Sequence, residues 1–254
     1  MQVTQKIPKI IHYCWFGNKP MSDKEKACVD SWHKFCPDYE ILQWNDSNYD
    51  IHKLKYMEEA AKAGKWSFVT DYVRLDVLYQ YGGFYFDTDV EMLKSMEPLR
   101  QYTAFIGFEQ NDRVNDGQGI GAAPGCYMIK EMRDMYENLS FQNPDGSLNL
   151  IECPQYRTRY LVQKGLKKNG KRQKVEEMEI FPADYFCPKS FHTGKIVITS
   201  NTYSIHFFNS SWHTEDEIRG ILKVQKVKRI LGRRFGGALL QCYFNFKHYI
   251  LHRD

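Results

Sequence analysis

Hydrophobic positions in residues 67–91, SFVTDYVRLDVLYQYGGFYFDTDVE, predict a helix followed by a short strand. The apolar residues Val69, Val73 and Val77 recur every four residues. This is the spacing of one helix face. Gly82-Gly83 then ends the pattern, as a helix terminus and a sharp turn require. The aromatic run at 84–86 predicts a buried strand.

The same reading along the chain predicts alternating strands and helices. Strands are expected at 9–15, 39–44, 103–108, 179–182, 196–198 and 203–208, and helices at 22–35, 50–63, 124–139 and 157–168. The first helix begins with a capping box, in which Ser22 precedes Glu25 by three residues. Glu109–Gly125 is polar and rich in glycine and is expected to form a loop. This alternation predicts an α/β fold with a mainly parallel sheet covered by helices on both faces.

Asp87 and Asp89 directly follow the aromatic strand. Residues two apart in an extended chain point to the same side, so both carboxylates should face one point beyond the strand end. Carboxylate oxygens suit Mg²⁺ or Mn²⁺. An Asp-x-Asp tripeptide alone is more often a solvated loop, but three aromatic residues leading into it favour a site held by buried structure.

Asp71 and Arg74 lie one turn apart on the strongly apolar helix. One interpretation is an intrahelical salt bridge, which contributes little to stability on a surface. The other is functional, because a helix this apolar is expected to be buried, and buried charges need partners or a role. The pattern of residues leaves both interpretations open.

Several motifs taken together resemble the DXD-containing glycosyltransferases of family 32. They are Thr70-Asp71-Tyr72-x-Arg74, Tyr81-Gly82-Gly83, Phe84-Tyr85-Phe86-Asp87-x-Asp89, an N-terminal Ile7-Pro8-Lys9-Ile10-Ile11-His12-Tyr13-x-Trp15-Phe16-Gly17 and a late His206-x5-Trp212. That family includes capsular polysaccharide enzymes and is related to glucosylating bacterial toxins. The resemblance spans residues 7–213.

The resemblance implies a GT-A-like catalytic domain over residues 1–213 and a set of site residues. Asp87, Asp89 and His206 would hold the metal, and the imidazole would favour Mn²⁺ over Mg²⁺. Asp71, Arg74, Asp89 and Asn115 would act at the transferred sugar and its diphosphate. The nucleotide sugar would be bound by Trp15, Phe16, Asp71, Arg74, Asp87, Thr88, Ser210 and Trp212.

The implied reaction is metal-dependent transfer of a sugar, with retention, from a nucleotide-diphosphate donor to a glycan or lipid-linked acceptor in surface polysaccharide synthesis. A UDP-sugar is favoured, while the base, the sugar and the acceptor stay open. The alternative is a non-catalytic carbohydrate-binding protein of the same fold. A phosphotransferase of the Asp-x-Asp-x-Thr/Val type is disfavoured because Glu91 stands at its last position. A calcium loop is disfavoured because Pro98 stands at its twelfth.

Composition places the chain among ordinary globular proteins, with 43% hydrophobic and 26% charged residues in 254. Seven scattered cysteines without a CxxC pair argue against a zinc ribbon and fit a reducing cytosol. No apolar run is long enough to span a bilayer, and the N-terminus lacks the features of a signal peptide. A cytoplasmic protein is therefore expected.

The positive charge is concentrated in the C-terminal segment 214–254. It holds nine Lys or Arg and four acidic residues, or 9 − 4 = +5, whereas the rest of the chain carries 26 − 27 = −1. A basic amphipathic extension with aromatic residues suits an anionic membrane surface, and packing of a helix pair on the sheet is the alternative. Nucleic-acid binding has no supporting motif. Both interpretations stay open, and the first of them implies peripheral attachment to the inner membrane face.

Overall fold

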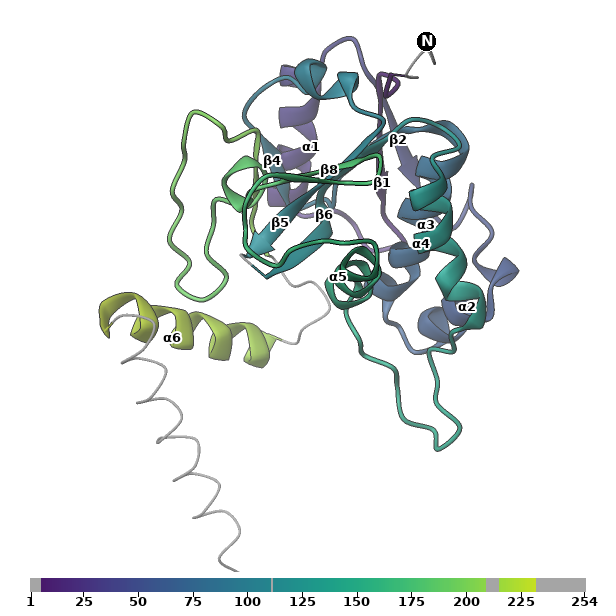
Figure 1. The fold of residues 1–254 in the computed structure, drawn as a ribbon. Coiled ribbons are helices and arrows are strands. Elements are labelled where there is room, and N and C mark those ends of the chain that lie inside the picture. The colour runs from purple at the N-terminus through teal and green to yellow at the C-terminus, as the bar shows by residue number, and fades with distance from the viewer. Residues whose placement is uncertain (1–5, 111, 209–214, 232–254) are drawn as a thin grey trace, which may run out of the picture. The chain divides into compact units, whose positions relative to one another are not determined.

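A computed structural model describes residues 6–110, 112–208 and 215–231. Within these ranges the main sheet has seven strands in the order β2-β1-β3-β6-β5-β8-β7 (Figure 1). Their bounds are β1 (Ile10–Cys14), β2 (Glu40–Trp44), β3 (Gly83–Tyr85), β5 (Ala104–Gln110), β6 (Arg113–Ala122), β7 (Gln173–Val175) and β8 (Met178–Phe181). A second sheet pairs β4 (Val90–Met92) with β9 (Ser204–His206).

The predicted α/β class is confirmed, with a mixed sheet. Strands β1, β2, β3, β5 and β8 share one direction, while β6 and β7 run against their neighbours. The loop expected over Glu109–Gly125 was wrong, because most of it is the ten-residue strand β6. Its glycines and polar residues give no strand signal, and hydrogen bonding to both β3 and β5 determines its conformation.

The helices pack on both faces of the main sheet, with α1 on one face and α2 to α5 on the other (Figure 1). Alternating side chains of one strand segment supply both cores, since Phe84 and Phe86 pack with Trp32 of α1 while Tyr85 packs with α3. The helices on this sheet are α1 (Asp23–Phe35), α2 (Lys55–Lys62), α3 (Trp66–Tyr81), α4 (Tyr127–Asp134) and α5 (Cys153–Gln163). One further described helix is α6 (Glu215–Leu231). Short 3₁₀ turns are η1 (Ile51–Lys53), η2 (Glu97–Gln101), η3 (Met135–Asn138) and η4 (Ala183–Tyr185).

Local signals placed the start of α1 correctly, whereas two other predicted elements differ from the structure. The capping box at the start of α1 is present, with the Ser22 backbone N–H donating to the Glu25 carboxylate at 2.6 Å. The predicted strand at 196–198 does not form, because Ile196 makes only an isolated bridge to Lys189. The helix expected from 157 begins earlier, at Cys153, with Pro154 in its first turn.

The end of α3 is fixed from the neighbouring strand β1. Gly82 ends the helix at φ 65°, a conformation that favours glycine. The Trp44 indole N–H donates to His12 Nδ1 at 3.1 Å, so Nε2 carries the proton that reaches the Gly82 carbonyl at 2.8 Å. Burial lowers the pKa of His12 to about 4, and the ring is neutral at pH 7. This contact holds the turn that leads into β3 and its acidic end.

The chain divides into two compact units. Met1–Pro188 with Ile198–Phe207 forms one, and Lys189–Val197 with Phe208–Asp254 forms the other. In the second unit, the Gln225 side chain donates to the Phe191 carbonyl at 2.7 Å and so links α6 to the loop at 189–197. None of the described helices combines the length and apolar character needed to cross a bilayer.

Candidate active site

Asp87 and Asp89 occupy a tight turn between β3 and β4. The Val90 N–H donates to the Asp87 carbonyl at 3.1 Å, and the Asp87 N–H donates to the Gly117 carbonyl of β6 at 2.8 Å. The two acids therefore follow a buried strand, as the sequence predicts. A turn brings them together, and not the extended backbone that the spacing suggested, because the chain reverses at Thr88 and Asp89 to enter β4.

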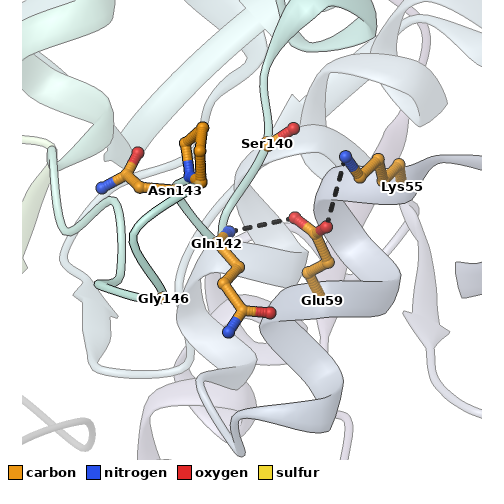
Figure 2. A pocket seen from close by; sticks show the side chains of 7 residues that line it. Lys55, Glu59, Ser140, Gln142, Asn143 and Gly146 are labelled. Carbon is orange, nitrogen blue, oxygen red and sulfur yellow. Dashed lines mark hydrogen bonds and ion pairs between the residues drawn. The ribbon is translucent and has the colours of Figure 1, made fainter.

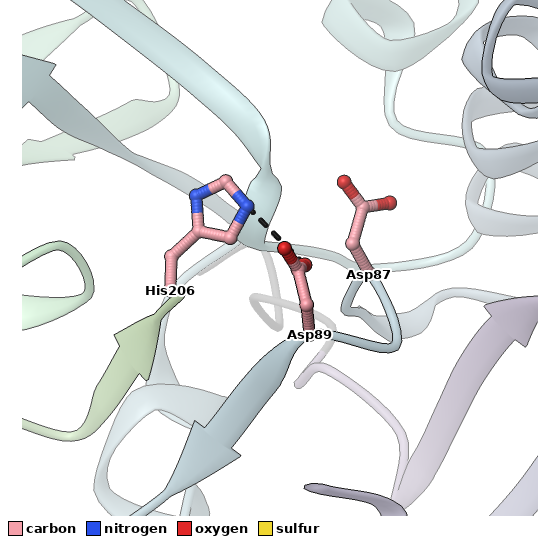
Figure 3. A group of neighbouring side chains, drawn as sticks. All are labelled: Asp87, Asp89 and His206. Carbon is pink, nitrogen blue, oxygen red and sulfur yellow. Dashed lines mark ion pairs between the residues drawn. The ribbon is translucent and has the colours of Figure 1, made fainter. Parts of the chain in front are cut away.

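Pairing of β4 with β9 brings His206 to the same turn. His206 lies opposite Val90 in the ladder, and the Phe207 N–H donates to the Asp89 carbonyl at 2.9 Å. The imidazole Nε2 is 3.3 Å from an Asp89 oxygen (Figure 3). One ligand atom from each of Asp87, Asp89 and His206 lies within 4.8 Å of the other two. Two carboxylates and an imidazole are a suitable ligand set for a divalent metal such as Mn²⁺.

Charges around the turn change the proton affinities of these groups. Burial lowers the pKa of His206, but the Asp89 carboxylate and a hydrogen bond with the Cys187 thiol outweigh it, so the pKa rises well above its ordinary value. Burial and the Asp89 charge raise the pKa of Asp87, against the opposing effect of Arg74. A divalent cation at this position would replace the proton on the imidazole and favour both carboxylates in their charged form.

Arg74 joins three carboxylates from different parts of the chain. Its Nη2 is 3.3 Å from Asp71 and 3.2 Å from Asp87, and its Nη1 is 2.9 Å from Asp116. The side chain is 3% exposed. The intrahelical salt bridge between Asp71 and Arg74 is therefore present, but it is one part of a buried network that reaches the candidate metal ligand Asp87.

Sequence analysis did not identify two members of this network, Asp116 and Arg157. Arg157 Nε is 2.6 Å from Asp116 Oδ2, and both side chains are 0% exposed. Burial favours a neutral Asp116, yet Arg157 and Arg74 hold its pKa at about 2. Nothing in the sequence marks Arg157, whereas Asp116 could have been found as an isolated charge in a glycine-rich segment once that segment was recognised as a strand.

Asp71 behaves differently from Asp116 although both are buried. The pKa of Asp71 is raised to about 7, mainly by burial. The Arg74 charge opposes this rise, and the Asp116 charge adds to it. A buried carboxyl group with a pKa near neutrality, in contact with other charged groups, is typical of a functional site.

Gly117 lets the Asp87 carboxylate lie directly against β6. A Cβ atom at Gly117 would be 2.1 Å from Asp87 Oδ2 and 3.3 Å from Arg74 Nη1. No other residue leaves this space open, so Gly117 is required for close approach of the carboxylate to the strand.

Two further predicted site residues, Asn115 and Thr88, differ in how far they are buried. Asn115 is buried in β6, where its Oδ1 accepts from the Gly117 N–H at 2.8 Å and its Nδ2 is 3.4 Å from Glu109. Thr88 is partly exposed in the turn between the two acids. Contact of Asn115 with a sugar stays a prediction.

Trp15 and Phe16 follow β1, whose parallel neighbour β3 leads to Asp87. The Trp15 indole is partly exposed and donates to the Lys19 carbonyl at 2.5 Å, while Phe16 is buried edge-on against Tyr49. Both residues thus lie at the carboxyl edge of the sheet, where ligands of such sheets bind. Ser210 and Trp212 lie outside the described residues.

A separate hollow of about 400 Å³ lies between α2 and the loop at 140–146 (Figure 2). Glu59 of α2 accepts from the backbone N–H groups of Phe141 and Gln142 at 2.8 and 3.0 Å and lies 3.6 Å from Lys55. Its carboxylate holds this loop in place. The hollow is lined by Lys55, Glu59, Ser140, Gln142, Asn143, Pro144 and Gly146, and it contains none of the site residues above.

Comparison with known proteins identifies the region that carries the site. Residues 22–106 match the family model described as "Glycosyltransferase sugar-binding region containing DXD motif". Residues 22–106 are thus similar to the sugar-binding region of DXD-type glycosyltransferases. This range includes Asp71, Arg74, Asp87 and Asp89, and the resemblance noted from the sequence motifs is confirmed.

Two relatives from Schizosaccharomyces pombe extend the similarity. The chain is 34% identical over 116 residues to "Inositol phosphoceramide mannosyltransferase 3", a match that covers 39% of this chain and 29% of the relative. It is 25% identical over 219 residues to "Inositol phosphoceramide mannosyltransferase 2", covering 83% of this chain and 59% of the relative. The chain thus spans less than two thirds of either relative.

The fold of this chain has a solved counterpart in "PaToxG Glycosyltransferase". The two structures superpose with a TM-score of 0.50 at 22% identity, over 63% of this chain and 70% of that chain. This likeness concerns the fold and confirms the GT-A-like α/β architecture.

Proposed function

We propose that this protein is a metal-dependent glycosyltransferase that transfers a hexose from a nucleotide-diphosphate sugar. The observation that carries the proposal is that His206 of β9 meets Asp87 and Asp89, which lie in the range 22–106 that matches a DXD-type sugar-binding region. The turn follows β3, and Trp15 lies at the end of the adjacent parallel strand. That edge of an α/β sheet is where nucleotides bind.

The side chains divide the work of such a reaction. Asp87, Asp89 and His206 would hold the divalent ion, which offsets the negative charge of the departing diphosphate. Arg74 orients the Asp87 carboxylate from the buried side. Asp71 and Asn115 are assigned to the sugar hydroxyls, and Thr88, Phe16, Ser210 and Trp212 to the nucleotide sugar. The resemblance implies retention of the anomeric configuration. Since no described residue is marked as a covalent nucleophile, we propose that the acceptor attacks on the same face as the leaving group.

The donor and acceptor are proposed by class. A UDP-sugar is the donor favoured by the resemblance, and the names of the yeast relatives add mannose as a candidate sugar. Those names also state a lipid acceptor, inositol phosphoceramide. We accordingly propose a glycan or lipid-linked acceptor, with surface polysaccharide synthesis as the setting.

The described part of α6 supports attachment to an anionic membrane surface. Its exposed side chains include four cations and two large apolar residues: Arg219, Lys223, Lys226, Arg229, Leu222 and Ile230. Leu222 is 57% exposed and Ile230 is 69% exposed. Cations mixed with exposed apolar side chains suit a lipid headgroup region. The proposed location is cytoplasmic, peripheral on the inner face of the membrane, and the buried free thiols of Cys14, Cys28 and Cys36 are compatible with a reducing compartment.

A donor panel tests the function. Purified protein is incubated with UDP- and GDP-linked hexoses, with Mn²⁺, with Mg²⁺ and with chelator, and released nucleoside diphosphate is measured. We expect release from one donor group that needs the metal and is fastest with Mn²⁺. Sugar binding without nucleotide release from any donor would instead favour the non-catalytic carbohydrate-binding protein.

A further inference from the structure

Next to the turn that holds Asp87 and Asp89, two buried arginines from different helices bind one aspartate. Arg74 of α3 reaches Asp116 Oδ1 at 2.9 Å, and Arg157 of α5 reaches Asp116 Oδ2 at 2.6 Å. Each carboxylate oxygen therefore accepts from a different guanidinium group. Asp116 itself comes from β6, next to the glycine on which the Asp87 carboxylate lies.

The guanidinium group of Arg74 is bound on every side. Its Nε donates to the Thr70 carbonyl at 3.2 Å, and Nη2 donates to the Thr70 hydroxyl at 3.1 Å and to Asp87 at 3.2 Å. Its Nη1 donates to Asp116 at 2.9 Å and is 3.5 Å from Cys153 Sγ. The plane of the fork is thus fixed by groups on α3, β6 and α5, and this plane determines where Asp87 is held.

Arg157 anchors the arrangement from the other side. Its Nη2 donates to the Asp71 main-chain carbonyl at 2.9 Å and to the Tyr136 hydroxyl at 3.2 Å. The guanidinium carbon lies 5.2 Å from the centre of the Tyr136 ring. Arg157 therefore ties α5 to the backbone of α3 at Asp71 and sets the position of Asp116 relative to that helix.

We propose that Asp116 and Arg157 are positioning residues that hold Arg74, and through it Asp87, in the geometry required for metal binding and sugar transfer. The contacts that connect them to Asp87 run through Arg74. Their contribution to the reaction rests on the proposed function, whereas their contribution to the metal site does not. A merely structural pair would stabilise the fold without changing the metal affinity of a variant that still folds.

The network makes this sensitivity physically reasonable. Removing the charge of Asp116 takes away the carboxylate that Arg74 and Arg157 share. A buried charge without its counter-charge is strongly unfavourable, which favours a new contact with another carboxylate. Asp71 and Asp87 are the carboxylates within reach of Arg74. Arg74 would therefore shift toward them and carry the Asp87 carboxylate out of its ligand position.

The test compares Asp116→Asn with Asp76→Asn. Asp76 is a second buried aspartate on α3 that binds Lys53 and Arg133 and lies outside the site. Mn²⁺ affinity is measured by titration calorimetry without nucleotide, kcat and KM by nucleotide release, and stability by thermal melting. We expect Asp116→Asn to weaken Mn²⁺ binding by about tenfold and to lower kcat by about 10- to 100-fold, as changes behind metal ligands do. Asp76→Asn should lower Tm but leave Mn²⁺ affinity and kcat near wild type.

Arg157→Lys carries the same test should Asp116→Asn fail to fold. An ammonium keeps the charge but cannot bond Asp116, the Asp71 carbonyl and Tyr136 together. We expect weaker Mn²⁺ binding than wild type in this folded variant. Unchanged Mn²⁺ affinity and kcat in a folded Asp116 or Arg157 variant would overturn the proposal, and so would equal losses in Asp76→Asn. If wild-type protein binds Mn²⁺ but releases no nucleotide, the proposed function fails, and the Mn²⁺ titration alone decides on the positioning pair.

Discussion

Asp71 and Asp76 lie on the same helix, and both are buried, but their surroundings differ. Asp76 accepts from the Tyr49 hydroxyl at 2.7 Å, Lys53 at 2.6 Å, Gln80 at 2.8 Å and Arg133 at 3.2 Å. Among the described cations, only Arg74 forms an ion pair with the Asp71 carboxylate, at 3.3 Å. Burial raises the pKa of both, but hydrogen bonds from Lys53, Tyr49 and Gln80 bring that of Asp76 below its ordinary value, whereas that of Asp71 reaches about 7.

The difference separates a fully paired structural carboxylate from one to which the proposed function gives a role. A buried charge destabilises a fold unless partners replace its lost hydration. Asp76 has these partners and joins α3 to η1 and α4. Asp71 shares its arginine with two further carboxylates, Asp87 and Asp116. Buried carboxyl groups whose pKa is strongly raised are frequent at functional sites.

The largest effect should come from removing a metal ligand. We expect Asp87→Asn and Asp89→Asn each to lower metal-dependent nucleotide release by at least about 100-fold, because each loses a charged ligand to the ion that offsets the leaving-group charge. Circular dichroism and thermal melting should show a folded protein. Release at the wild-type rate in both variants would remove the metal role from the turn.

Gly117→Ala should have the next largest effect. The new methyl group would overlap Asp87 Oδ2 and displace the carboxylate, so we expect about a 10- to 100-fold loss of kcat and weaker Mn²⁺ binding. Gly121→Ala is the control on the same strand, since its Cβ would meet the Phe105 ring at 2.4 Å. It should lower Tm without changing Mn²⁺ affinity. Equal Mn²⁺ affinities in the two variants would contradict the role given to Gly117.

The contributions of Asp71 and Asp76 to the free energy of unfolding should change with pH in opposite directions. The pKa of Asp71 rises on folding from 3.8 to about 7, so its contribution is fully present below about pH 4 and is lost as pH rises to 7. This loss, relative to Asp71→Asn, is on the order of 4 kcal/mol. The pKa of Asp76 falls on folding, so its contribution is present above about pH 4 and is lost as pH falls further.

Urea unfolding of the wild type, Asp71→Asn and Asp76→Asn between pH 3 and 8 measures both effects. The free-energy difference between wild type and Asp71→Asn should move against the wild type as pH rises, and that for Asp76→Asn should move against it as pH falls. Two differences of the same sign would end the distinction between the two carboxylates.

Exposed charges extend the comparison and should give the smallest effect. Lys223 and Lys226 of α6 are exposed, and each well-placed cation contributes about 1 kcal/mol to binding of anionic lipid. We expect the double change to Glu to reduce sedimentation with anionic liposomes at low salt, and high salt to release the wild type. The same change at exposed Lys167 and Lys168, in the loop after α5, is the matched control. An equal reduction in the control would mean that net charge, and not the α6 surface, governs binding.

The sequence alone determined the parts of the site that depend on short-range patterns. The four-residue spacing of valines predicted α3, the glycine pair predicted its end, and the aromatic run placed Asp87 and Asp89 beyond a buried strand. Helix period, glycine conformation and strand burial are all encoded within a few residues. For the same reason the two candidate partners on α3, Asp71 and Arg74, could be paired from their spacing.

Tertiary structure decided which distant residues complete the site. His206 lies beside Asp89 because β9 pairs with β4 in one register, and that register depends on backbone hydrogen bonds between segments far apart in the chain. Strand β6 forms from a glycine-rich segment because β3 and β5 flank it. Arg157 meets Asp116 only after α5 packs on β6. No local period specifies these contacts, because each is favourable only when its partner is already in place.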